Sequence, residues 1–295
     1  MAGVAVIGAG AIGGYVAAAA SRNGHDVQLC VRTPLAALRV DHATGTDRPE
    51  VGIVSRPELA GTVDCVLLTT KAHDSAGAVA WFDRLCGPQT VVVVMQNGVD
   101  HVERIQPLVP GSEVLPALVH LAADRVAPGH VVHLSGRRVV LPAGPTAERV
   151  AALLTGELLD VELEADFLTA SWRKLLLNAA ANPITAITGR RLGVLDLPEV
   201  RELATGMLRE AVAAGAASGA DLTDRDVAAT LDTYTRLGPT VGTSMLADRL
   251  AGRPVEYDLI TAAVVRAAAS HGVDAPLNRA VLALLAGVST AGASA

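Results

Sequence analysis

A glycine-rich turn near the beginning of the chain constrains its fold more than any other feature. Gly8, Gly10 and Gly13 form a G-x-G-x-x-G pattern after the apolar run Val4–Ile7, and a helix is expected over Ala17–Asn23. The first glycine permits a tight turn, the second lets a pyrophosphate approach the backbone, and the third lets helix and strand pack closely. This pattern predicts a dinucleotide-binding turn in a Rossmann domain. The expected cofactor-binding residues are Gly8, Ala9, Gly10, Ala11, Ile12 and Gly13.

Compact apolar runs recur along the first half of the chain. We expect strands at Val4–Ile7, Val27–Val31, Val63–Thr70, Val91–Met95 and Val114–Val119. Each run is short and apolar throughout, which is typical of a strand buried on both faces of a parallel sheet. The first half is therefore predicted to be an α/β domain.

The second half of the chain has a different pattern. A hairpin is predicted within Val131–Leu141, with its turn at Ser135-Gly136, and from Ala165 onward the periodicity is helical. We therefore predict two domains. Residues 1–164 form an NADP-binding Rossmann domain with a parallel sheet, and residues 165–295 form an all-helical domain for substrate binding and catalysis. The last residues, 289–295, are expected to fray.

Charge and cysteine content narrow the choice of partner and compartment. The net charge of −6, without a cluster of basic residues, argues against nucleic acid or an anionic membrane as a partner, so a small-molecule substrate is expected. Cys30, Cys65 and Cys86 lack the spacing of a disulfide framework or a zinc site, so no metal is predicted. The uncharged first twenty residues lack the basic region of a signal peptide. A cytoplasmic location is predicted.

The end of the second expected strand indicates which nicotinamide cofactor binds. In NAD-binding domains this strand normally ends with an acidic residue that accepts a hydrogen bond from the ribose 2′-hydroxyl. Here the strand ends Cys30-Val31-Arg32, and a guanidinium suits a 2′-phosphate. We predict NADP(H) as the cofactor, with Arg32 binding the phosphate. The alternative is that Arg32 is a solvated surface charge.

Two lysines are notable because the chain otherwise uses arginine. Of the 24 basic residues, only Lys71 and Lys174 are lysines. The pKa of a lysine ammonium can be lowered until it releases a proton near neutral pH, whereas a guanidinium stays charged. Lys71 and Asn97 also lie just past the carboxyl ends of expected strands, where doubly wound sheets bind ligands. We therefore predict that both belong to the cofactor site.

Lys174 is followed by Asn178 and Asn182 at helical spacing. On a single helix these residues form one polar stripe in a segment that is otherwise leucine and alanine. Polar groups on such a helix need partners, and an asparagine side chain can both donate and accept hydrogen bonds. Pro183 is expected to kink or end the helix. The stripe predicts a ligand site, and the alternative is a solvated helix face.

These motifs together resemble the ketopantoate reductase (2-dehydropantoate 2-reductase) family over nearly the whole chain. The Lys174 helix resembles the most specific signature of that family, and the glycine-rich turn resembles its cofactor domain. The matching segments are Gly8–Gly13, Arg32, Lys71, Gln96–Gly98, Trp172–Leu175, Asn178, Asn182-Pro183, Ser244–Leu246 and Arg253–Glu256.

The resemblance implies an activity and a role for individual residues. It implies NADPH-dependent reduction of ketopantoate, or of a closely related branched 2-oxo acid, with Lys174 as the proton donor. Glu256 is then the second catalytic residue, which positions Lys174 and the substrate hydroxyl. The implied substrate ligands are Asn97, Asn178, Asn182 and Ser244, and Asn97 also adjoins the cofactor ribose. A homodimer is implied as well.

One segment departs from the family pattern. After its glutamate the family usually has an Asp and then an Asn-Gly pair; here Asp258 is kept, but Thr261-Ala262 replaces the pair. The identity of the 2-oxo acid therefore stays open. Two other functions remain alternatives: a 3-hydroxyacid dehydrogenase-type oxidoreductase, which also has Lys followed by Asn four residues later, and a non-catalytic NADPH-sensing module.

Overall fold

The structure is a computed structural model that describes residues 1–291, and it divides into two units. The first unit comprises Met1–Gln96 and His101–Phe167, and the second comprises Asn97–Asp100 and the chain from Leu168 onward. The four residues Asn97–Asp100 thus belong to the second unit, although their neighbours in sequence belong to the first. No helix within residues 1–291 is both long and apolar enough to cross a membrane.

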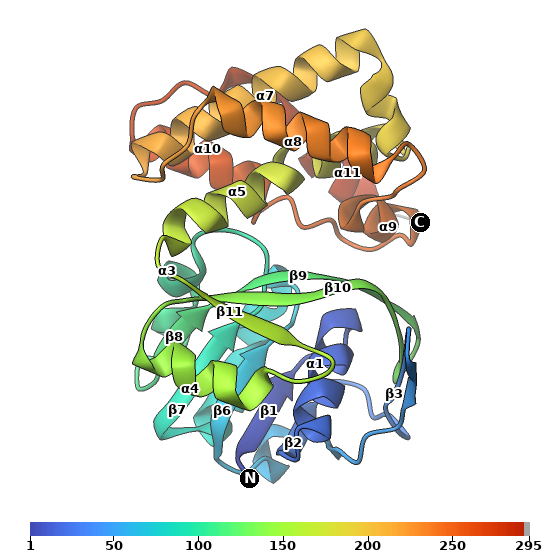
Figure 1. Cartoon of the computed structure of the whole chain (residues 1–295), viewed down its shortest axis with the longest axis vertical. Helices are drawn as coiled ribbons and strands as arrows, with labels where there is room; N and C mark the ends of the chain where they lie inside the picture. The colour runs from blue at the N-terminus through green and yellow to red at the C-terminus, as the bar shows by residue number, and fades with distance from the viewer. Residues whose placement is uncertain (292–295) are drawn as a thin grey trace. The chain divides into compact units, whose positions relative to one another are not determined.

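A six-stranded parallel sheet forms the centre of the first unit (Figure 1). Val4 and Val6 point into a core with helix α1 (Ala11–Arg22), whereas Ala5 and Ile7 point into a second core with α2 (Val79–Leu85). The sheet is therefore buried on both faces, and the predicted α/β fold class is confirmed. In spatial order the strands are β5 (Gly52–Val54), β2 (Asp26–Cys30), β1 (Gly3–Ile7), β6 (Val63–Leu68), β7 (Cys86–Val94) and β8 (Glu113–Pro116).

A smaller sheet packs on the other side of α1, and β10 lies at its centre (Figure 1). Strand β10 pairs antiparallel with β9 and parallel with both β3 and β11. The strands of this sheet are β3 (Arg39–His42), β4 (Gly45–Asp47), β9 (Leu118–Ala127), β10 (His130–Pro142) and β11 (Asp160–Glu164). The remaining elements of the unit are α3 (His101–Ile105), α4 (Pro145–Leu154) and the 3-10 helices η1 (Pro57–Leu59), η2 (Ala72–Ala78) and η3 (Gln106–Leu108).

The hairpin predicted within Val131–Leu141 is wrong. This stretch is one continuous strand, and the hairpin turn lies earlier, between β9 and β10, at Gly129. Gly136 does have a left-handed φ of +69°, but the pairing with β9 continues on either side of it with a shifted register. A Cβ at Gly136 would overlap the His120 carbonyl oxygen, so the glycine serves a β-bulge and a close strand contact.

Two other predicted boundaries are also corrected. Helix α1 begins at Ala11, well before Ala17, because Gly13 and Gly14 belong to the helix. A Cβ at Gly14 would lie 2.7 Å from Cγ2 of Val131, so this glycine allows close packing against β10. The expected strand Val114–Val119 is two strands, because the chain leaves the larger sheet after β8 and enters the smaller one as β9.

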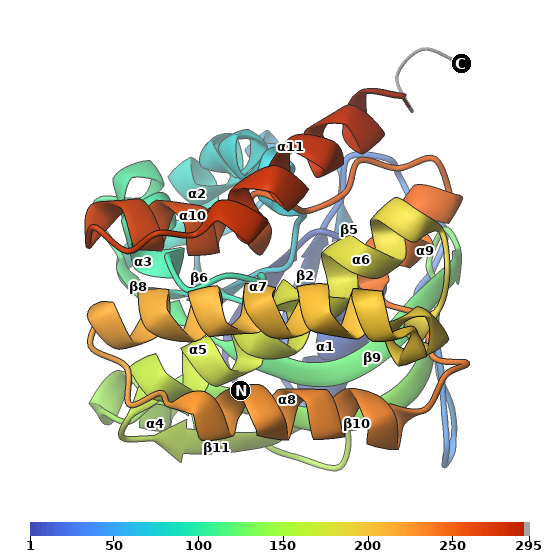
Figure 2. The ribbon, with the colours of Figure 1, turned by 90° about the horizontal axis from the view of Figure 1, so that it is seen from above.

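The second unit is helical, as predicted (Figure 2). Its helices enclose one apolar core. Helix α7 contacts α8, α10 and α11, and α6 packs against α9. The helices are α5 (Phe167–Ala179), α6 (Ala181–Thr188), α7 (Pro198–Ala217), α8 (Asp224–Leu237), α9 (Ser244–Leu250), α10 (Thr261–Ser270) and α11 (Pro276–Ala291), with the 3-10 helix η4 (Leu192–Asp196). Because α11 continues through Ala291, only residues 292–295 of the stretch expected to fray remain, and they lie outside the described residues.

The polar stripe does not lie on a single helix. Helix α5 ends at Ala179 and α6 begins at Ala181, so Asn182 lies on a different helix from Lys174. The cause is Pro183, which has no N–H to donate to the Ala179 carbonyl and whose ring would clash with it. Pro183 therefore lies in the first turn of a new helix.

The Tyr234 hydroxyl of α8 binds backbone groups on both sides of the break between α5 and α6. This buried hydroxyl lies 3.1 Å from the carbonyl oxygens of both Leu176 and Leu177, and it accepts a hydrogen bond from the Ala181 N–H at 3.4 Å. These groups would be left without partners by the interruption of the helix. Burial raises the pKa of the Tyr234 phenol, so the hydroxyl keeps the proton that it donates.

Candidate active site

The glycine-rich turn is held by hydrogen bonds from the strands on both sides of β1. The Gly8 N–H donates to the Cys30 carbonyl at the end of β2 at 3.0 Å, and Gly8 has a left-handed φ of +109°. The Thr69 hydroxyl, just after β6, lies 3.0 Å from the Ile7 carbonyl oxygen and 2.9 Å from that of Gly8. Thr69 was not predicted as a site residue, because a threonine at a strand end carries no distinctive pattern.

The turn has the features that a dinucleotide pyrophosphate requires. A Cβ at Gly13 would overlap the Gly8 carbonyl oxygen, whereas a Cβ at Gly10 would meet no atom of the described residues within 4 Å. Gly13 therefore serves close packing, and Gly10 leaves open space beside the backbone. No described side chain caps α1 and its first turn has no acidic residue, so its N–H groups are available to an anion. Ala9 and Ile12 of the turn are partly buried and pack against the core of the first unit.

Arg32 and Lys71 lie beyond the ends of the strands that flank β1. The Arg32 side chain is 84% exposed, and its Nη1 donates to Oδ1 of Asp74 in η2 at 3.0 Å. Lys71 is half-buried and immediately precedes η2. Both residues therefore lie at the carboxyl edge of the parallel sheet, on either side of the glycine-rich turn.

Gln96 connects the segments that follow β6 and β7. Its side-chain amide donates to the Thr70 carbonyl at 2.9 Å and to the Ser75 hydroxyl at 2.8 Å, and its Oε1 accepts from Arg104 at 3.1 Å. These hydrogen bonds hold Gln96, the residue that precedes Asn97, in place. The sequence placed Gln96 next to a site residue but did not indicate this structural role.

Lys174 of α5 lies next to Asn97 within the second unit. The Lys174 ammonium donates to Oδ1 of Asn97 at 3.3 Å. Burial lowers the pKa of Lys174 to about 8, while the negative charge of Glu256 acts in the opposite direction. Residues 97, 174 and 256, which are far apart in the sequence, are thus brought into one electrostatic cluster. An ammonium with this pKa can deliver a proton near neutral pH.

The segment Asn97–Asp100 is held against the start of α10. Nη2 of Arg266 donates to Oδ2 of Asp100 at 2.8 Å and to the Asp258 carbonyl at 3.0 Å. Gly98 has a φ of +107°, and a Cβ there would lie 3.3 Å from the Leu259 carbonyl oxygen. Arg266 thus connects the Asn97 segment to the segment that follows Glu256. The sequence offered no signal for Arg266, because arginine is frequent throughout the chain.

Asn182 is 3% exposed, and its side-chain Nδ2 has no hydrogen-bond partner among the described residues. The next turn of α6 is tied to α9, because the Thr185 and Thr243 hydroxyls lie 2.7 Å apart and Thr243 caps α9. Ser244, the first residue of α9, is exposed. An unpaired buried amide costs about 1 to 3 kcal/mol, so the Asn182 side chain is suited to a ligand that accepts its hydrogen bond.

Asn178 is the last of the predicted substrate ligands, and Thr261 belongs to the segment that departs from the family pattern. Asn178 lies one turn beyond Lys174 on α5 and is partly exposed. Thr261, which departs from the family pattern, is fully buried at the start of α10, and its hydroxyl has no hydrogen-bond partner within residues 1–291.

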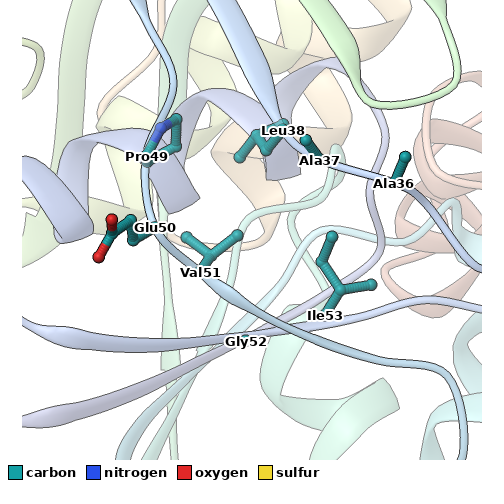
Figure 3. Close-up of a pocket in the computed structure, with 8 residues that line it drawn as sticks. All are labelled: Ala36, Ala37, Leu38, Pro49, Glu50, Val51, Gly52 and Ile53. Atoms are coloured by element: carbon teal, nitrogen blue, oxygen red, sulfur yellow. The ribbon is translucent and has the colours of Figure 1, made fainter.

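The first unit also has an open cavity of about 400 Å³ (Figure 3). Its lining comes from the loop before β3 and from β5 with the residues preceding it, and Glu50 is the one charged lining residue. None of the predicted cofactor-binding residues is among its lining.

Known proteins match the chain over nearly its whole length. The family model described as Ketopantoate reductase PanE/ApbA matches residues 4–146, and the corresponding C-terminal model matches residues 166–289. The 2-dehydropantoate 2-reductase of Mycobacterium tuberculosis is 41% identical over 97% of this chain and 98% of its own length. The enzyme of the same name from Caulobacter vibrioides is 37% identical, with the same coverage. This chain belongs to the ketopantoate reductase family.

Solved structures agree with the assignment to the ketopantoate reductase family. A PanE/ApbA family ketopantoate reductase from Ralstonia eutropha superimposes with a TM-score of 0.91 at 28% identity, covering 99% of both chains. A D-mandelate dehydrogenase solved with NADH and anilino(oxo)acetate has a TM-score of 0.89 at 21% identity and 99% coverage of both chains, which shows a shared fold. As a ketopantoate reductase family member with a Rossmann-type domain, the chain is an oxidoreductase that uses a nicotinamide cofactor.

Proposed function

We propose that this protein reduces 2-dehydropantoate, or a closely related branched 2-oxo acid, with NADPH, and that Lys174 is the proton donor. The observation that carries the proposal is the Lys174 cluster. Its ammonium lies 3.3 Å from Asn97 Oδ1, has a pKa lowered to about 8, and interacts with the charge of Glu256. The 41% identical relative from Mycobacterium tuberculosis carries the name of this activity.

The first unit holds the cofactor in this proposal. Residues Gly8–Gly13 bind the pyrophosphate through backbone N–H groups at the start of α1, and Arg32 binds the 2′-phosphate, with Lys71 and Asn97 as further ligands. When bound, NADPH supplies the hydride that reduces the ketone carbon. Arg32 in place of the usual acidic residue supports NADPH over NADH.

The second unit supplies the proton and orients the substrate. As the substrate carbonyl becomes an alkoxide, the Lys174 ammonium stabilises the negative oxygen and transfers one proton to it, leaving a neutral amine that recovers a proton from solvent. Asn97 accepts a hydrogen bond from this ammonium and so orients it. Glu256 keeps Lys174 more protonated than burial alone would allow, and in the proposal it also positions the substrate hydroxyl.

Three polar side chains are the proposed substrate ligands together with Asn97. Asn182 has a buried amide without a partner among the described residues, which fits a donor to a carboxylate or hydroxyl oxygen. Asn178 on α5 is partly exposed, and Ser244 on α9 is exposed. The buried Thr261 hydroxyl, in place of the family's usual Asn, leaves the choice among branched 2-oxo acids open.

The decisive experiment measures substrate-dependent NADPH oxidation by the wild type and by the Lys174→Ala and Lys174→Arg variants. Lys174→Ala should lower kcat by about 10² to 10⁴, the usual contribution of a general acid. Lys174→Arg keeps a positive charge but cannot release a proton, so it is the matched control and should also lose turnover. Full turnover by Lys174→Arg would show that only the charge matters and would refute proton donation.

The choice of substrate separates the alternatives. Ketopantoate should be assayed in parallel with other branched 2-oxo acids. Oxidation of 3-hydroxyisobutyrate without reduction of ketopantoate would instead indicate a 3-hydroxyacid dehydrogenase. Tight NADPH binding without turnover of any of these acids would indicate a sensing module.

The proposal extends to the assembly and compartment. We propose a homodimer, a state that the resemblance implies and that is reported for a ketopantoate reductase of Staphylococcus aureus with the same fold. We also propose a cytoplasmic location, consistent with three cysteines that form no disulfide in the structure. Light scattering of the purified protein should give twice the chain mass of 30.2 kDa, and a monomer would refute the dimer.

A further inference from the structure

We infer that Asp74 is a specificity-determining residue, which competes with the cofactor 2′-phosphate for the Arg32 guanidinium and so weakens the preference for NADPH over NADH. This inference rests on the proposed function, because it takes Arg32 as the phosphate ligand. Asp74 was not among the residues singled out from the sequence.

The geometry places the competing carboxylate across the cofactor turn. In the sheet β1 lies between β2 and β6, and Arg32 follows β2 whereas Asp74 lies in η2, which follows β6. The 3.0 Å ion pair of Arg32 with Asp74 therefore connects the segments on either side of the glycine-rich turn. The Gly8 N–H is bonded to Cys30, two residues before Arg32, so the turn and the ion pair share one edge of the sheet.

The two partners of the ion pair differ in how firmly they are held. Asp74 is 33% exposed, and its backbone N–H donates to the Lys71 carbonyl at 3.0 Å. Its second carboxylate oxygen lies 3.8 Å from Nε2 of His73. The Arg32 side chain, in contrast, is 84% exposed. The carboxylate is thus fixed by its helix, and the guanidinium is the partner that can exchange one anion for another.

The consequences for the cofactor follow from charge. To bind Arg32, a 2′-phosphate must displace the Asp74 carboxylate from the guanidinium, and it then lies near this negative charge. Both effects oppose NADPH binding. A ribose 2′-hydroxyl carries no charge, and a carboxylate is the group that accepts its hydrogen bond in NAD-binding domains. Asp74 therefore penalises NADPH without penalising NADH.

Two fragments of the cofactor test this directly, without turnover. Adenosine 2′,5′-bisphosphate and adenosine 5′-monophosphate differ only in the 2′-phosphate, and their affinities for the wild type and the Asp74→Asn variant can be measured by calorimetry. An exposed ion pair contributes roughly 0.2 to 1 kcal/mol of interaction free energy, which the 2′-phosphate no longer has to overcome in Asp74→Asn. We therefore expect Asp74→Asn to bind the bisphosphate about 1.4- to fivefold more tightly, with no gain for the monophosphate.

The matched control is Glu162→Gln, which removes a carboxylate from another exposed ion pair of the first unit. Glu162 on β11 pairs with Arg138 at 3.1 Å, in the smaller sheet. This variant should leave the ratio of the two fragment affinities unchanged. An equal gain in Glu162→Gln would show that net charge alone is responsible and would overturn the inference.

Other outcomes separate this inference from the proposed function. If Arg32→Ala reduces the preference for the bisphosphate but Asp74→Asn leaves it unchanged or lowers it, Asp74 does not compete for Arg32, and the inference fails while the NADPH assignment stands. If Arg32→Ala leaves the preference unchanged, the assignment of Arg32 to the 2′-phosphate fails, and this inference fails with it. The ratio of kcat/KM for NADPH and NADH should change in the same direction as the fragment affinities.

Discussion

The two candidate regions of this chain are built in different ways. The glycine-rich turn of the first unit consists of backbone between β1 and α1, and it is held by hydrogen bonds to Gly8. The Lys174 cluster of the second unit consists of side chains, with Asn97, Lys174 and Glu256 coming from distant segments. A backbone site should therefore be disrupted by one added methyl group, whereas a side-chain site should respond to the loss of the groups that support it.

The largest effect is expected at the backbone site. In Gly13→Ala the new Cβ would overlap the Gly8 carbonyl oxygen, a backbone atom that cannot move without loss of the turn. We expect a decrease of more than about 4 kcal/mol in the free energy of unfolding, measured by denaturant titration, and loss of NADPH binding. Gly10→Ala is the matched control, because its Cβ meets no described atom within 4 Å and the variant should fold with normal stability. Equal stability of the two variants would contradict the distinction.

A smaller loss of stability is expected from a change at the break between α5 and α6 in the second unit. Tyr234→Phe removes the hydroxyl that pairs with the Leu176 and Leu177 carbonyls and with the Ala181 N–H. Leaving these buried groups without a partner should cost about 1 to 3 kcal/mol of unfolding free energy.

Tyr257→Phe serves as the control for Tyr234→Phe, because the Tyr257 hydroxyl makes no hydrogen bond among the described residues. Thermal and denaturant unfolding should therefore show little change for Tyr257→Phe. If the two variants lose the same stability, the Tyr234 hydroxyl does not support the break.

The ion pair that holds the Asn97 segment should affect turnover more than stability. Arg266→Ala removes the hydrogen bonds to Asp100 and to the Asp258 carbonyl, so Asn97 should hold the Lys174 ammonium less well. We expect about a tenfold lower kcat, because small misplacements of catalytic groups are costly. The change in stability should stay below about 1 kcal/mol, since the Arg266 side chain is 51% exposed.

The controls for Arg266→Ala separate a positioning role from a general effect. Arg266→Lys keeps a cation opposite Asp100 and should recover part of the lost kcat. Arg279→Ala removes an exposed ion pair with Asp274 and should leave kcat unchanged. An Arg266→Ala enzyme with wild-type kcat and an altered KM alone would contradict the positioning role.

The same contrast explains how much could be predicted from the sequence. The glycine-rich turn and the strands around it were predicted because local residues determine a backbone conformation. The stripe of Lys174, Asn178 and Asn182 was predicted as a set, and Pro183 was expected to interrupt its helix. The sequence did not indicate that the interruption lies before Asn182, at Ala180, where Tyr234 of another helix binds the backbone groups that it frees.

Elements stabilised by distant partners were also missed. Strands β3 and β4 are short and polar, and Asp41 of β3 is held by Thr46, Arg39 and His130. No local apolar pattern marks such strands. Asp74 and Arg266 were missed for a similar reason, because the sequence gives no sign of which exposed charges form pairs. The functional roles of the predicted site residues stay predictions.

The smallest expected effect is a change in pH dependence at the Lys174 cluster. Proton donation requires the ammonium, so kcat/KM for the reduction should be constant below the Lys174 pKa of about 8 and fall as pH rises through it. The Glu256 carboxylate raises this pKa, so Glu256→Gln should move the falling limb to lower pH. Glu256→Asp keeps the charge and should move it less. If the falling limb of kcat/KM moves to higher pH in Glu256→Gln, or persists unchanged in Lys174→Arg, another group is titrating. Lys174 would then not be the proton donor.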